Sequence, residues 1–291
     1  MEWYYLILIS SVCAGVAAVI EKNSLKMEHA TAFSASVTPL IALLSFVFIP
    51  FVSLAAFNLT IWQLLLLFIA SALNAYTFLL SMRVFRHGEI STASPPLSSL
   101  PIALVVILAF LFLGEHLTGF QYIGIAGIVV VTYMLLFRIR KRKREKQAFD
   151  GDKYKRMILI NVCITAAVNI LTKYLLYEVD PYAFLIISGM FMSVCFAILI
   201  SIRYRGVKEI IETVKRYHVT LGINALLSLA SRASYYLALV SVPVSLAQPL
   251  SNTFYLMITI ILGGFIFHEE GLKRKLALGA IMLFFVYLLT L

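Results

Sequence analysis

The residue with the strongest chemical signal is an arginine inside a long apolar segment. Arg232 occurs in LGINALLSLASRASYYLALV, within a predicted helix over residues 219–241. It lies about ten residues, or roughly 15 Å at the rise of an α-helix, from either end of that helix. A charge at the centre of a bilayer is costly, so it must face water, a partner or a ligand. We therefore expect Arg232 to bind the anionic group of a substrate. The alternative is a structural arginine bonded to the carbonyls of a broken helix.

Other polar side chains also lie well inside apolar segments. Each would lose free energy facing lipid, so we expect each to point into the protein. Asn161, Thr165 and Asn169 recur every four residues and therefore share one helix face, as Gln248 and Asn252 do. Hydrogen bonding between helices explains any one of them as well as substrate binding does. The set predicted to bind substrate with Arg232 is Asn74, Ser94, Asn161, Thr165, Asn169, Gln248 and Asn252.

Prolines interrupt two apolar segments at equivalent places. Pro95 and Pro96 lie near the start of one predicted helix, and Pro249 lies near the start of another. Proline removes a backbone donor, which frees a carbonyl and permits a kink. We expect these bends to line a cavity and to let one group of helices move against the other. Static packing kinks are the alternative.

Among the fourteen acidic residues, thirteen fall in loops or at helix termini away from the apolar interior. The exception is Glu21, at the end of the first apolar segment, which is a candidate proton site. The simpler alternative is an interfacial ion pair with the adjacent Lys22.

Motifs of catalysis and metal binding are missing from the sequence. The five histidines form no HExxH pattern, the three cysteines form no CxxC pair, and no GxxxxGK[ST] phosphate-binding loop occurs. We predict a protein that is not an enzyme and that requires no metal or cofactor.

The composition is that of a protein dissolved in lipid. Hydrophobic residues make up 62% of the chain and charged residues 13%, and the mean hydropathy is +0.95. The net charge of +10 resides in short segments between apolar runs, which argues against a nucleic-acid partner. A bilayer needs about 20 apolar residues per helix. Ten segments meet that length: 3–21, 30–56, 61–82, 90–113, 119–137, 157–176, 182–202, 219–241, 244–267 and 275–291. The prediction is an all-α membrane protein with ten transmembrane helices, a small-molecule substrate and lipid as partners, and a monomeric or homodimeric state.

The two halves of the chain resemble each other. GEISTASPPLSSL at 88–100 aligns with SVPVSLAQPLSNTF at 241–254 with an offset of 154, and Lys22 aligns with Lys173 with an offset of 151. The basic linker 138–156 separates the copies, which predicts one unit over 1–137 and a second over 157–291. Because each unit has five helices, the second must lie inverted relative to the first.

Charge bias predicts the orientation. Of the 24 Lys and Arg residues, 22 fall in the odd-numbered connections between segments. Positive residues accumulate on the cytoplasmic side. We expect the odd-numbered connections to be cytoplasmic and both termini to lie outside a plasma or inner membrane. The connection 203–217 also shows apolar residues at helical spacing, which predicts a short amphipathic helix on the inner surface.

The sequence GEISTASPPLSSLPIALVVILAFLFLGEHLTGFQYIGIAGIVVVTYML resembles the EamA-like branch of the drug/metabolite transporter superfamily. Residues 243–284 repeat its pattern more loosely. The resemblance implies a secondary transporter that exports or exchanges small metabolites, such as amino acids or organic anions, by alternating access around a midplane site between the units. A lipid or lipid-linked sugar flippase on the same scaffold is one alternative. A membrane-embedded enzyme or assembly factor without a transport cycle is another.

Overall fold

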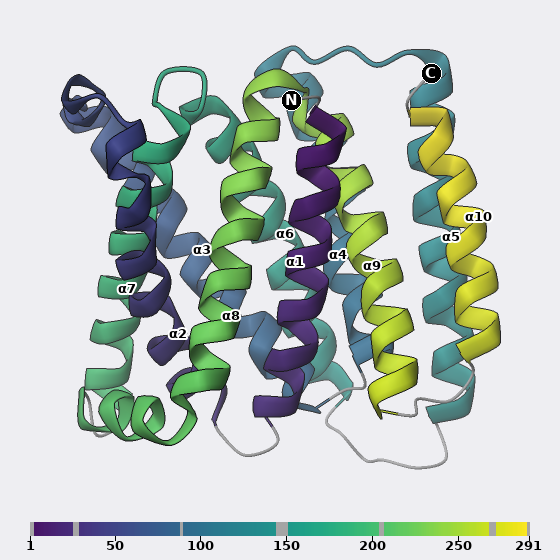
Figure 1. Cartoon of the computed structure of the whole chain (residues 1–291). Coiled ribbons are helices and arrows are strands. Elements are labelled where there is room, and N and C mark those ends of the chain that lie inside the picture. Colours follow the sequence, from purple (N-terminus) through teal and green to yellow (C-terminus); the bar gives the residue numbers. More distant parts are fainter. Residues whose placement is uncertain are drawn as a thin grey trace.

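The computed structural model describes residues 3–25, 29–87, 90–143, 151–203, 207–267 and 272–289. Within these ranges the chain forms ten α-helices and two short 3-10 helices, and it contains no strand. The helices cross the bundle in alternating directions, and both chain ends lie at the same end of it (Figure 1). The elements are α1 Trp3–Ser24, α2 Ala30–Ser45, η1 Phe46–Phe51, η2 Leu54–Phe57, α3 Ile61–His87, α4 Ile90–Leu113, α5 Gly119–Lys143, α6 Gly151–Leu175, α7 Pro181–Arg203, α8 Val207–Ser241, α9 Val244–Phe267 and α10 Leu272–Leu289.

Eight of the described segments are long and apolar enough to cross a bilayer, and Gly119–Val131 is a shorter apolar helix. The predicted all-helical fold with ten helices is therefore confirmed. Helices α4 and α9 continue through Pro95, Pro96 and Pro249, all three of which are buried.

One predicted helix was too long. The segment 30–56 is α-helical only as far as Ser45, and the chain then tightens into the 3-10 helices η1 and η2. Pro50 explains the change, because it has no N–H to donate to the carbonyl of residue 46 and its ring crowds that carbonyl. Hydropathy could not predict the end of the α-helix at Ser45, because the residues that follow it are also apolar.

The two ends of the predicted basic linker are helical. Helix α5 continues to Lys143 and α6 begins at Gly151, so much of the predicted linker 138–156 is helix. Residues 144–150 lie outside the described ranges. Lysine and arginine are good helix formers, so a charged segment next to an apolar helix can prolong it.

The amphipathic segment before the eighth span does form a helix. Two helices meet within α8 at Tyr217, whose backbone angles (φ −126°, ψ 26°) are not helical. In the first part Lys208 is exposed, while Ile210 and Val214 pack partly buried against the core. Its position at the membrane surface remains a prediction.

Eight helices form a closed ring. In order around it, α1 packs on α8, α8 on α2, α2 on α7, α7 on α3, α3 on α6, α6 on α4, α4 on α9, and α9 on α1. Helices α5 and α10 pack together outside the ring, against α4 and α9 (Figure 1). Buried side chains such as Phe33, Phe184 and Phe196 fill the contacts between neighbouring helices. The ring leaves space for a site at its centre.

A charged turn joins the two halves at one end of the bundle. Gly114 adopts a left-handed φ of 65° just after α4, and the Glu115 N–H donates to the Ala109 carbonyl at 3.3 Å, which closes the helix end. This turn directs the Glu115 carboxylate to the start of α9. There it accepts hydrogen bonds from Val244 N (2.9 Å), Ser245 N (3.0 Å) and Ser245 Oγ (2.5 Å). A carboxylate satisfies the free N–H groups of a helix start and favours its dipole.

Candidate functional site

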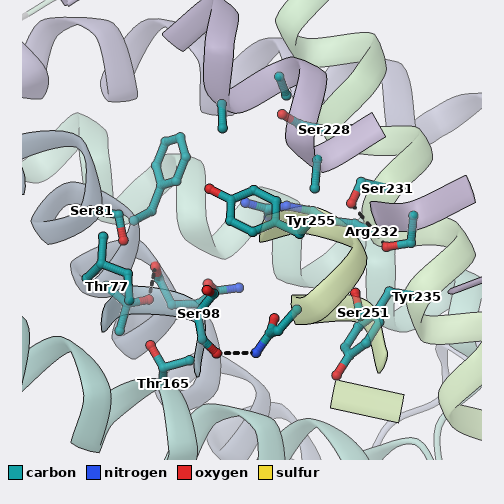
Figure 2. A pocket seen from close by; sticks show the side chains of 18 of the residues that line it. Thr77, Ser81, Ser98, Thr165, Ser228, Ser231, Arg232, Tyr235, Ser251 and Tyr255 are labelled. Carbon is teal, nitrogen blue, oxygen red and sulfur yellow. Dashed lines mark hydrogen bonds between the residues drawn. The ribbon is translucent and has the colours of Figure 1, made fainter. Parts of the chain in front are cut away.

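A polar cavity of about 380 Å³ lies at the centre of the ring. Its walls come from α1, α3 and α4 of the first half and from α6, α8 and α9 of the second. Figure 2 shows how side chains from these helices converge on it, and it labels Thr77, Ser81, Ser98, Thr165, Ser228, Ser231, Arg232, Tyr235, Ser251 and Tyr255. Hydroxyl and amide groups in such a space must face one another, water or a solute.

Nearly all of the predicted substrate-binding residues line this cavity. They are Arg232, Asn74, Asn161, Thr165, Asn169, Gln248 and Asn252, and Glu21, the candidate proton site, lines the cavity with them. Ser94 is different: it is fully buried in α4 and is not a lining residue. Its neighbours Pro95 and Pro96, and Pro249 on α9, are likewise buried behind the wall. The fold thus brings together residues separated by more than 200 positions, although their roles in binding remain predictions.

Arg232 has few bonds to protein. It is partly buried, and among the described residues its only hydrogen bond runs from Nη1 to the Met192 sulfur at 3.2 Å. A thioether is a weak acceptor, and a guanidinium has five N–H donors. No ion pair with a carboxylate and no bond to a carbonyl is formed within the described chain. The expected alternative, an arginine bonded to carbonyls of a broken helix, is not what the structure contains.

Glu21 lies deeper in the cavity wall than an interfacial residue would. Its side chain is 5% exposed, and Asn224 Nδ2 on α8 donates to Oε1 at 3.4 Å and to the Ala17 carbonyl at 3.0 Å. The ion pair with Lys22 that offered the simpler explanation is not formed; Lys22 instead donates to the Phe85 carbonyl. Arg232 lies within electrostatic reach of Glu21 but makes no direct ion pair with it.

The amides of α6 are occupied by bonds to neighbouring helices. Asn161 Nδ2 donates to the Thr77 carbonyl at 2.9 Å and to Ser81 Oγ at 3.1 Å, which joins α6 to α3. Asn169 Nδ2 donates to the Thr165 carbonyl at 2.8 Å, and its Oδ1 accepts from Tyr235 at 3.3 Å. For these residues, interhelical bonding accounts for the polar side chains.

Three other amide side chains of the cavity wall differ in how many hydrogen-bonding groups remain unused. Asn252 Nδ2 donates to the Ser98 carbonyl, so only part of its capacity remains. Gln248 is 3% exposed, and its Oε1 has no hydrogen-bond partner. The Asn74 side chain likewise forms no hydrogen bond with the described residues. A buried polar atom without a partner costs free energy, so Gln248 is the lining amide most in need of one, while the half-buried Asn74 can reach water in the cavity.

The sequence prediction missed the hydroxyl groups and rings that complete the wall. On α8 these are Ser228, Ser231, Tyr235 and Tyr236, and on α9 they are Ser251 and Tyr255. Helical spacing could have identified all of them except Ser231, because the other five lie three or four residues from Arg232, Gln248 or Asn252 and so share the same helix faces.

Comparison with known proteins finds a family match over the first of the two predicted units. Residues 1–137, which carry α1 to α4 and most of α5, match the EamA-like transporter family. The match spans slightly less than half of the 291-residue chain. EamA-like proteins are membrane transporters of the drug/metabolite type, so the match implies membrane transport at that general level. None of the curated proteins matches the sequence.

Fold similarity extends beyond the EamA-like half. One solved structure, described only as the crystal structure of a protein, matches 99% of this chain and 98% of its own length. The TM-score is 0.66 and the sequence identity is 13%. At that identity the likeness establishes the fold alone. Among the described residues, no three His, Cys, Asp or Glu side chains cluster to hold a metal ion.

Proposed function

We propose that the protein is a secondary transporter of small metabolites that bear an anionic group, bound by Arg232 at the centre of the bundle. The observation that carries this proposal is a guanidinium with unused donors in the central cavity, whose only hydrogen bond among the described residues goes to a thioether sulfur. A volume of about 380 Å³ falls within the range of roughly 300–1,000 Å³ found for small-molecule sites. It is small for a whole lipid, which disfavours the flippase alternative.

The substrate we infer also carries an amino group. Arg232 and Glu21 line the same cavity without pairing, so one cation and one carboxylate are both available to a solute. A zwitterion can satisfy both, because its anionic group complements the guanidinium and its ammonium complements the carboxylate. Tyr235, Tyr236 and Tyr255 supply apolar ring surface beside these charges.

Thermal stabilisation of the purified protein by a matched ligand panel tests this chemistry. The panel contains amino acids, the corresponding acids without the amino group and the corresponding amines. We expect amino acids to raise the melting temperature most, because a ligand at a hundred times its Kd stabilises the folded state by about 2.7 kcal/mol. Glu21→Gln should remove the advantage of the amino acids over the acids. Stabilisation by amines alone, or by none of the compounds, would contradict the assignment.

Alternating access around this cavity is supported by the way the helices pair. With helices 1–5 taken as equivalent to 6–10, most of the contacts around the ring occur in equivalent pairs: α1 with α8 and α6 with α3, or α1 with α9 and α6 with α4. Asn252 donates to the carbonyl of Ser98, its own equivalent at the offset of 154. Equivalent residues meet where a two-fold axis passes between two copies. We infer inverted repeats related by an axis through the cavity.

The orientation we propose has both termini outside the cytoplasm. The support is the charge bias, since the connections at the opposite end from the termini carry 22 of 24 basic residues. A reporter active only in the cytoplasm should therefore be inactive when fused after Leu291. The same reporter inserted between residues 146 and 147 should be active. The reverse pattern would overturn the orientation and leave the fold unaffected.

A further inference from the structure

The residues that line the cavity correspond position by position between the two halves of the chain. At the offset of 151, each lining residue of α1 has an equivalent in α6 that also lines the cavity. These pairs are Ser10 and Asn161, Ala14 and Thr165, Ala17 and Val168, Ala18 and Asn169, and Glu21 and Thr172. At the offset of 154, each lining residue of α8 has a lining equivalent in α3. These pairs are Ser228 and Asn74, Ser231 and Thr77, Arg232 and Phe78, Tyr235 and Ser81, and Tyr236 and Met82.

One hydrogen bond is repeated in the same way. Ser10 Oγ and Ser231 Oγ are 3.2 Å apart and join α1 to α8. Their equivalents are Asn161 and Thr77, and Asn161 Nδ2 donates to the Thr77 carbonyl at 2.9 Å, which joins α6 to α3. The cavity wall therefore contains two equivalent parts, which we call the α1–α8 half-site and the α3–α6 half-site.

The two half-sites lie across the cavity from each other. In the ring of helices, α2 and α7 separate them on one side, and α4 and α9 separate them on the other. Figure 2 shows Thr77 and Ser81 on one side of the cavity and their equivalents, Ser231 and Tyr235, on the other. A solute that spans the cavity therefore meets one half-site with each of its ends.

The half-sites differ in charge. Glu21 and Arg232 both lie in the α1–α8 half-site, and the residues equivalent to them are Thr172 and Phe78. Among the lining residues that the structure describes, the α3–α6 half-site contains no charged side chain. A charge that leaves water without meeting a partner loses free energy. The charged head group of a solute is therefore stable in one half-site only, and its other end faces the neutral half-site.

The neutral half-site still has a hydrogen-bonding group to use. Asn161 and Asn169 form bonds to neighbouring residues through their amides. The Asn74 side chain is half-buried, lines the cavity and forms no hydrogen bond with the described residues. An amide offers both a donor and an acceptor. Phe78, one helical turn along α3, adds ring surface beside it.

We propose that the α3–α6 half-site is a separate subsite for the side chain of the solute, that it selects an uncharged hydrogen-bonding group, and that Asn74 is the selecting residue. The proposal rests on the proposed function, from which it takes a zwitterionic head group bound by Arg232 and Glu21. A charged side chain would find no counter-charge in this subsite, and an aliphatic one would cover the Asn74 amide without bonding it. The substrate class is therefore amino acids with amide or hydroxyl side chains.

Amino acids that share a head group and a shape, but differ in side-chain chemistry, test the subsite. Asparagine is compared with aspartate, which adds a charge, and with leucine, which replaces the amide by methyl groups. Threonine and valine form a second pair of equal shape. Thermal-shift titration of the purified protein gives a Kd for each. We expect asparagine to bind about tenfold more tightly than aspartate or leucine, the scale of one unpaired polar group.

Asn74→Leu isolates the selecting residue. It should remove the preference for asparagine over leucine, while leucine itself still binds through its head group. Asn58→Leu makes the same change at an exposed position after η2, outside the cavity, and should keep the preference of the parent. If Asn74→Leu does not fold, Asn74→Ala gives the same readout.

Phe78→Arg should reverse the specificity. It places a guanidinium at the position equivalent to Arg232, so aspartate should then bind about tenfold more tightly than asparagine. Equal binding of all the amino acids by the parent, or an unchanged preference in folded Asn74→Leu, would overturn the subsite and leave the head-group assignment standing. Failure of every amino acid to bind would overturn both proposals.

Discussion

Arg232→Gln should abolish stabilisation by anionic and zwitterionic ligands while leaving the unliganded melting temperature near that of the parent. A buried charge pair that loses one partner weakens binding by about 2–5 kcal/mol, or roughly 30-fold to several thousand-fold in Kd. The effect on folding should be small, because among the described residues the side chain gives up one hydrogen bond, to the Met192 sulfur. Thermal shift with and without ligand measures both quantities, and uptake into proteoliposomes measures transport.

Two further variants sharpen this test. Arg232→Lys retains the charge but cannot bind an anion through two parallel N–H donors, so binding should be intermediate. Arg274→Gln removes the same charge from an exposed position on α10, away from the cavity, and should bind like the parent. The outcome that contradicts the assignment is a much lower melting temperature for Arg232→Gln with no ligand effect in the parent. Arg232 would then be a structural residue.

Gly15→Ala should destabilise the bundle by about 1–3 kcal/mol, the usual cost of overpacking a close helix contact. Gly15 is where α1 passes closest to α9. A β-carbon there would lie 2.5 Å from Ile258 Cγ2 and 2.8 Å from Ile258 Cβ. Rotation of the isoleucine can move Cγ2 but not Cβ, so the helices must separate. The prediction is a lower melting temperature in detergent, measured without ligand.

Gly222→Ala provides the matched control. It lies in α8, and an added β-carbon there meets no atom within 4 Å. Alanine favours a helix over glycine by about 1 kcal/mol, so this variant should melt at or above the parent temperature. Ile258→Ala combined with Gly15→Ala removes the nearest methyl and should recover part of the loss. Equal melting of Gly15→Ala and Gly222→Ala would show that α1 and α9 are less tightly packed than described.

Sequence periodicity located the spans because an apolar run of helical length has few stable alternatives in lipid. It could not place their ends where backbone chemistry intervenes, as at Pro50, or where charged residues prolong a helix, as beyond residue 137. The same logic applies to the cavity. The free-energy cost of a polar side chain facing lipid predicted that Arg232, Asn161 and Asn169 point inward. It could not distinguish residues that bond neighbouring helices from residues whose hydrogen-bond donors remain unused.

What the sequence by itself determined is the class of protein: an all-helical membrane protein with ten helices and an arginine inside an apolar span. Those properties follow from composition, spacing and solvation of single residues. The tertiary structure alone decided which groups share the cavity, and that Glu21 bonds Asn224 and not Lys22. These are contacts between distant segments, and their energies depend on which helices lie side by side, a property that no local pattern encodes.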